Sequence, residues 1–120
     1  MSHGEYSHIE IPFDDQTRAR TFFENVFGWQ FREMPGFEGY LLYTSGPGDL
    51  GGGLGQRGVG AGATIRNYVD VDSIDETLAK VTENGGSVVE PKTPVGDIGW
   101  YAVITTSEGD QLAVYETKAS

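Results

Sequence analysis

Two ionisable side chains near the start of the chain have a spacing that suits proton-transfer chemistry. His8 and Glu10 alternate with Ile9 and Ile11, which predicts a β-strand with one packed face and one face that presents the two polar side chains. An imidazole and a carboxylate can each act as a general base or acid. We therefore expect His8 and Glu10 to be candidate catalytic residues, either of which could act as the general base or acid.

A third candidate stands at the start of a second segment with the same pattern, where Arg66, Tyr68 and Asp70 occupy alternate positions. As a catalytic residue, Arg66 would stabilise the negative oxygen that forms when a carbonyl compound loses a proton. Structural roles are open as well. His8 could be a buried histidine bonded to the backbone, and Glu10 could pair with Arg66.

We expect other side chains to line a cavity around these groups. Aromatic walls could stack on a flat ligand, although the same aromatics would also suit ordinary packing between strands. The run Gly51, Gly52 and Gly53 could leave room for a ligand, or it could be a flexible loop. The expected ligand-binding residues are Phe31, Tyr40, Tyr43, Gly52, Gly53, Tyr68, Asp70, Trp100, Gln111 and Tyr115.

Two amphipathic helices are expected to position the strands. The first lies near residues 15–27, where apolar residues recur at helical spacing, with Asp14 or Asp15 as its cap and Gly28 as its end. The second lies near residues 74–84, after a capping box. Further strands are expected at 29–34, 40–44, 50–57, 87–90, 100–105 and 111–116, with a turn at 45–48.

The order of strand, helix and three strands therefore occurs twice. His8 and Arg66 are 58 positions apart, and so are Gly28 and Gly86. Two independent landmarks with one period indicate an internal repeat, and we expect residues 7–57 and 65–117 to superpose as related modules.

Composition narrows the class of protein. The chain has 120 residues, of which 38% are hydrophobic, no cysteine and a net charge of -10. We expect one domain with a real core, no disulfide or thiolate site, and no binding to nucleic acid or to anionic membranes. No apolar run approaches the length of a membrane span, so we expect a cytoplasmic protein. The acidic, lysine-poor surface would also suit a high-salt cytoplasm, and His3 is expected to be disordered.

The repeated order resembles the vicinal oxygen chelate superfamily, which includes glyoxalase I, bleomycin resistance proteins and extradiol dioxygenases. The chain is most similar to small uncharacterised glyoxalase-like proteins. The resemblance implies an α+β fold in which two tandem βαβββ modules form a curled, mostly antiparallel sheet cup, as a single domain over residues 1–120. The segments that carry the resemblance are 8–12, 23–29, 67–75, 91–94 and 108–110.

The resemblance also implies where a metal would bind. Catalytic members hold a divalent metal with one residue from the first and last strand of each module. His8 matches the first position, but the other three carry Gly52 or Gly53, Arg66 and Ala113. Because zinc or nickel sites need at least three protein donors and Arg66 is permanently charged, we expect no metal and no other cofactor.

Two functions are open at this stage. The chain could be a metal-independent lyase or isomerase of the glyoxalase superfamily that acts on a small carbonyl or enolisable compound. Alternatively, it could bind or sequester a small molecule without chemistry, like bleomycin resistance proteins, with aromatic walls around a flat ligand and an acidic rim that attracts a cation. In either case we expect a small-molecule ligand and a homodimer, as is the habit of the superfamily.

Overall fold

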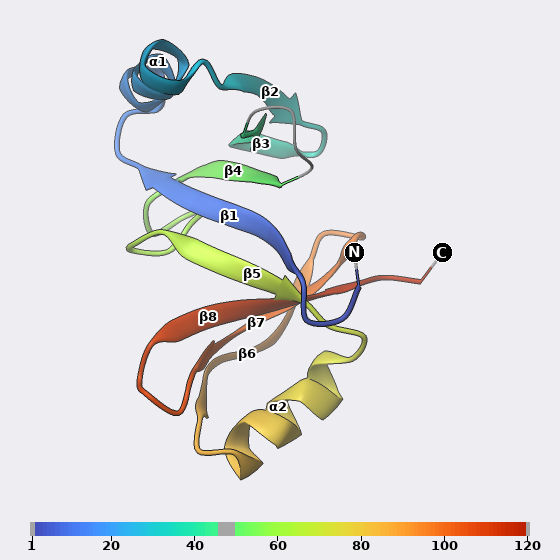
Figure 1. Ribbon diagram of the computed structural model, residues 1–120. Coiled ribbons are helices and arrows are strands. Elements are labelled where there is room, and N and C mark those ends of the chain that lie inside the picture. Colours follow the sequence, from blue (N-terminus) through green and yellow to red (C-terminus); the bar gives the residue numbers. More distant parts are fainter. Residues whose placement is uncertain (1, 46–49, 120) are drawn as a thin grey trace. The chain divides into compact units, whose positions relative to one another are not determined.

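The computed structural model describes residues 2–45 and 50–119. Among these residues it contains two helices and eight strands, and the expected α+β class and the βαβββ order of each half are confirmed (Figure 1). The elements are β1 (Tyr6–Phe13), α1 (Gln16–Phe27), β2 (Gln30–Met34), β3 (Phe37–Thr44), β4 (Gly51–Gln56), β5 (Arg66–Asp70), α2 (Ile74–Glu83), β6 (Ser87–Val95), β7 (Gly99–Thr105) and β8 (Gln111–Thr117).

The chain divides into two compact units. The first module is His8–Arg66, and the second module comprises the described residues from Asn67 onward together with those up to Ser7. No helix in the described part of the chain is both long and apolar enough to cross a membrane.

In the first module the strand order is β2-β3-β4-β1, with β1 parallel to β4 and the other neighbours antiparallel. Helix α1 begins where Asp15 accepts a hydrogen bond from the Arg18 backbone N–H, and ends at Gly28, whose φ of 73° is left-handed. One face of the sheet packs with α1 in a core that includes Phe13, Leu54 and, from the helix, Phe23.

In the second module the order is β5-β8-β7-β6, again with one parallel pair, β5 with β8. Ser73 caps α2 as expected, by accepting a hydrogen bond from the Glu76 N–H. A second cap was not expected from the sequence: Glu116 of β8 accepts a hydrogen bond from the Ile74 N–H at 2.8 Å. Ile74 is fully buried in the core beneath α2.

Two expectations differ from the structure. His3 is held in place instead of being disordered, because its Nδ1 accepts a hydrogen bond of 3.0 Å from the Asp72 N–H. Strand β6 continues beyond the expected range of 87–90, through Pro91 and Pro94. Among the described residues of its module, β6 pairs only with β7, and an edge strand tolerates prolines since one side of it needs no ladder hydrogen bonds. The predicted turn at 45–48 lies outside the described residues except for Ser45.

Candidate functional site

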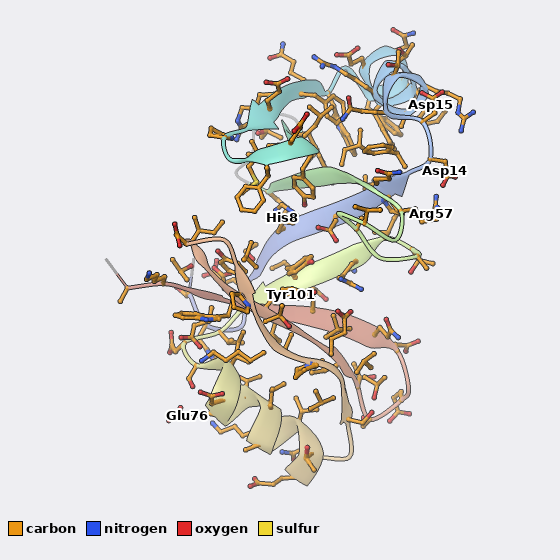
Figure 2. The ribbon with its side chains drawn as sticks, turned by 180° about the vertical axis from the view of Figure 1, so that it is seen from behind. His8, Asp14, Asp15, Arg57, Glu76 and Tyr101 are labelled. Carbon is orange, nitrogen blue, oxygen red and sulfur yellow. The ribbon has the colours of Figure 1, made fainter. Side chains whose placement is uncertain are left out.

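His8 and Glu10 project from the same face of β1, as the alternation predicts. Ile11 and Phe13, at the intervening parity, pack into the core with α1. The two polar side chains therefore lie on the face of the first module's sheet that α1 does not cover. Figure 2 labels His8 on this strand and Asp14 and Asp15 where it ends.

Tyr40 of β3 joins the two side chains through its hydroxyl group. The Tyr40 Oη donates a hydrogen bond to Glu10 Oε2 at 2.8 Å, and it lies 2.8 Å from His8 Nε2. Because the phenol has one proton and directs it to Glu10, His8 must donate to Tyr40 with a proton on Nε2. We call this arrangement the His8–Tyr40–Glu10 network.

Both ionisable side chains of this network, Glu10 and His8, are shielded from solvent to a large extent. Glu10 is only 6% exposed, whereas carboxylates are almost never buried without partners. Burial also lowers the pKa of His8 from 6.5 to about 4, because the charged imidazolium loses its hydration. His8 is therefore neutral near pH 7. Because its pKa is low, it is better suited to donate a hydrogen bond than to act as a general base.

The glycines of β4 make room for this network. Gly53 pairs with Glu10 across the parallel ladder, and a Cβ built on Gly53 would lie 1.8 Å from Tyr40 Oη. A Cβ on Gly52 would lie 1.7 Å from the Ile9 carbonyl oxygen. The glycine run thus belongs to a regular strand, and the space beside Gly52 and Gly53 is filled by the chain's own groups.

Two of the aromatics expected to line a cavity are core residues. Phe31 is 9% and Tyr43 4% exposed, and both belong to the core that α1 covers. The Tyr43 hydroxyl donates to the Ile9 carbonyl at 2.9 Å, and its ring stacks on Trp29 with centroids 4.6 Å apart. Burial raises the pKa of Tyr43 to about 12. Packing accounts for both aromatics without a ligand.

Two arginines hold the loop that leaves β4. The guanidinium of Arg66 lies against Gly62, where an added Cβ would be 2.6 Å from Nη2. Arg57 Nε donates to Asp14 Oδ1 at 3.0 Å, and its Nη1 donates to the Ala63 carbonyl (Figure 2). The sequence did not single out Arg57, because its partner lies 43 residues away.

In the second module, three tyrosines lie on the sheet face that α2 does not cover. Tyr68, Tyr101 and Tyr115 form one cluster with Val103 and Ala113. The Tyr101 hydroxyl donates to Glu90 Oε1 at 3.1 Å. Tyr101 and Glu90 were not expected from the sequence, although Tyr101 faces Tyr115 directly across the β7–β8 ladder.

The remaining predicted residues of this module divide between its two faces. Burial and the nearby Asp70 carboxylate both raise the pKa of Tyr115. Trp100 packs instead in the core beneath α2, with Lys92 Nζ 4.7 Å from its ring centroid. Trp100 and Tyr115 therefore lie on opposite faces of the second module's sheet and do not form one wall of a cavity. Gln111 is exposed at the start of β8.

Comparison with known proteins decides the family. A "Glyoxylase-like domain-containing protein" of Didymella fabae is 31% identical over 107 residues, which cover 78% of each chain. The chain belongs to the vicinal oxygen chelate superfamily. Within it, the family described as "Bleomycin resistance protein-like N-terminal" matches residues 7–44.

Relatives with lower sequence identity have similar descriptions. The "Putative glyoxylase CFP32" of Mycobacterium bovis is 25% identical over 119 residues, which cover 94% of this chain and 46% of that protein. The chain thus spans about half the length of the curated relatives that it matches first.

Solved structures share the fold of this superfamily member. A glyoxalase/bleomycin resistance protein/dioxygenase superfamily member from Vibrio splendidus 12B01 has a TM-score of 0.67 at 15% identity, covering 95% of this chain and 100% of that one. Methylmalonyl-CoA epimerase from Mycobacterium tuberculosis has a TM-score of 0.69 at 15% identity, covering 97% and 89%. At these identities the likeness extends to the fold alone.

The metal site of the superfamily does not fit these residues. Gly53 and Ala113 bring no donor atom, and Arg66 cannot give up its charge. Within residues 2–45 and 50–119, no three histidine, aspartate or glutamate side chains come together in a way that could hold a metal ion. His8 and Glu10, the donors closest to the expected position, are already bonded to Tyr40.

Proposed function

We propose that the chain is a metal-independent lyase or isomerase that acts on a small carbonyl or enolisable compound. The observation that carries this proposal is the His8–Tyr40–Glu10 network, in which a buried carboxylate, a phenol and a neutral imidazole are joined by hydrogen bonds. Such groups are typical of sites that move protons.

Glu10 is the general base of this proposal. Its carboxylate takes a proton from the carbon next to the substrate's carbonyl group, and the electrons of the C–H bond form the C=C bond of an enolate. The negative charge moves to the carbonyl oxygen, where Arg66 is proposed to stabilise it. Return of the proton to the other face of that carbon, or to another atom, completes an isomerisation. Neutral His8 holds Tyr40, and Tyr40 holds Glu10 in place.

The fold is compatible with this chemistry. Methylmalonyl-CoA epimerases are among the solved structures that share the fold, and an epimerase is an isomerase. The proposal extends the type of reaction from those proteins, and not their substrate, to this chain.

Hydrogen exchange in deuterated water tests the proposal. The probes are pyruvate, a small 2-oxo acid, and methylmalonyl-CoA, a thioester, with exchange at the enolisable carbon followed by NMR. We expect exchange above the buffer rate with at least one probe, and a loss of about 100-fold or more in Glu10→Gln. Glu83→Gln, at an exposed position at the end of α2, is the matched control. Equal rates in Glu10→Gln and the native chain would refute the role of Glu10.

Binding without chemistry is a second candidate, favoured by the tyrosine cluster of the second module. Tyr68, Tyr101 and Tyr115 share one face, with Glu90 and Asp70 beside them. Aromatic faces and carboxylates together suit a flat, cationic ligand. Titration calorimetry with bleomycin checks this candidate: we expect binding that weakens about tenfold or more in Tyr101→Leu. An unchanged affinity would remove it.

We also propose that the chain forms a homodimer. Phe22, Val26 and Phe27 of α1 are each more than half exposed, and a second copy would bury them. Light scattering should give about twice the chain mass of 13.0 kDa, and Phe22→Glu should give the single-chain mass. Val59→Glu, in the loop after β4, is the exposed apolar control that should leave the dimer intact. A native chain that is monomeric at micromolar concentration would contradict this.

A further inference from the structure

Tyr40 contacts β1 and β4, the two strands of the first module from which the superfamily's metal ligands would come. Its hydroxyl is 2.8 Å from His8 Nε2 and 2.8 Å from Glu10 Oε2, both on β1. It also fills the space above Gly53 on β4, since a Cβ there would be 1.8 Å from Tyr40 Oη and 2.1 Å from Cζ. One phenol thus meets both the first and the last strand of the first module.

Gly53 is a glycine for reasons of space. Its backbone is outside the left-handed region, so any residue could adopt its conformation. It pairs with Glu10 on one side and with Leu42 on the other, so a side chain at position 53 would point to the same face as Glu10. That is the strand from which a metal ligand would come, and Tyr40 occupies the ligand's place.

We propose that Tyr40 keeps divalent metals out of the first module. The phenol donates a hydrogen bond to Glu10 Oε2 and accepts one from His8 Nε2. The two atoms that would bind a metal are therefore already engaged in hydrogen bonds. A metal that displaced Tyr40 would gain two protein donors, fewer than a stable zinc or nickel site needs.

The proposal predicts that two substitutions open the site. Tyr40→Ala removes the phenol, and Gly53→Glu then has room to add a third donor beside His8 and Glu10. Neither change alone should suffice, because Gly53→Glu without Tyr40→Ala meets the phenol and Tyr40→Ala without Gly53→Glu leaves two donors.

Calorimetric titration with Ni²⁺ alone, with folding checked by circular dichroism, compares the native chain with four variants. We expect the weakest binding in the native chain, binding about tenfold tighter but still weak in Tyr40→Ala, and affinity about 100-fold tighter than the native chain's, at one Ni²⁺ per chain, in Tyr40→Ala/Gly53→Glu. Adding His8→Ala should remove that gain. Stoichiometric Ni²⁺ binding by the native chain that His8→Ala abolishes would overturn the proposal, as would a folded double variant that binds no better than the native chain.

If the double variant does not fold, Tyr40→Phe decides the question, because it keeps the ring and loses only the hydroxyl. Zn²⁺ should then perturb the His8 imidazole resonances at a concentration about tenfold lower than in the native chain. Equal Zn²⁺ responses in the two proteins would overturn the proposal. These readouts need no turnover, so the result is separate from that of the exchange experiment.

Discussion

The two modules place a tyrosine at the same register position and use it differently. Leu42 pairs with Gly53 in the first module as Val103 pairs with Ala113 in the second, so Tyr40 and Tyr101, two residues earlier, are equivalent. Tyr40 donates to Glu10 of the first strand, whereas Tyr101 donates to Glu90 of the edge strand β6.

The residue on the last strand explains the difference. Gly53 leaves space that the Tyr40 hydroxyl fills, but the equivalent Ala113 has a fully buried methyl group in that space. Tyr68, at the position of Glu10, lies with its ring centroid 6.5 Å from that of Tyr101. One methyl group thus accompanies the change from a polar network in the first module to an aromatic cluster in the second.

The largest effect is expected where the first module's strands approach most closely. Gly52→Ala places a methyl group 1.7 Å from the Ile9 carbonyl oxygen, and a backbone atom in a ladder cannot move aside. We expect a loss of about 3 kcal/mol or more in the free energy of unfolding, measured with urea. Gly60→Ala, whose nearest neighbour would be 3.6 Å away, is the control. A loss below about 1 kcal/mol at Gly52 would show that the strands are further apart.

The partly buried His8 of the first module should make the stability of the chain depend on pH. The folded pKa of His8, about 4, lies below its ordinary value of 6.5. Between these values the unfolded chain binds more protons, so stability falls as the pH falls from 6.5 towards 4, by up to about 3 kcal/mol. His8→Gln, which stays neutral, should lose this part of the slope in urea unfolding at several pH values. Parallel slopes in both proteins would contradict the burial of His8.

Gly53→Ala makes the first module resemble the second and should separate Tyr40 from Glu10. Since the tyrosine can move, the expected cost is about 1–3 kcal/mol, less than at Gly52. In a Tyr40→Ala background the same substitution should cost almost nothing, and a double-mutant cycle measures this coupling. Additive effects would mean that Tyr40 does not lie over Gly53.

The smallest effects are expected at the ion pairs beside the two helices. Arg57 pairs with Asp14 before α1, and Lys92 pairs with Asp75 in the first turn of α2. Both carboxylates are mostly exposed, so Asp14→Asn and Asp75→Asn should each cost about 1 kcal/mol or less in thermal unfolding. A much larger loss at only one of them would mean that this ion pair stabilises more of the fold than the end of its helix.

The sequence predicts much of the fold because the helix boundaries are chemically marked. Asp15, Gly28 and Ser73 have the capping geometry that their side chains or backbone freedom favour. Strand β6 was harder to place, since Pro91 and Pro94 are typical of connections and only its edge position makes them acceptable.

The candidate site is only partly predictable. The shared face of His8 and Glu10 follows from alternation within one strand. The role of Tyr40 does not, because it depends on the register of β3 against β4 and on the missing side chain at Gly53, 43 residues after Glu10. The register of β7 against β8 places Tyr101, and not Trp100, on the same face as Tyr115, whereas alternation along β7 shows only that Trp100 and Tyr101 point to opposite faces.

Nitrogen NMR of the His8 imidazole tests the central claim, that Tyr40 links a neutral His8 to Glu10, most directly. The chain has two histidines, so His3→Gln assigns the resonances. We predict that His8 carries its proton on Nε2 and stays neutral until the pH approaches its pKa of about 4, and that Tyr40→Phe changes the Nε2 resonance. A His8 that titrates at its ordinary value of 6.5, or that is unaffected by Tyr40→Phe, would contradict it.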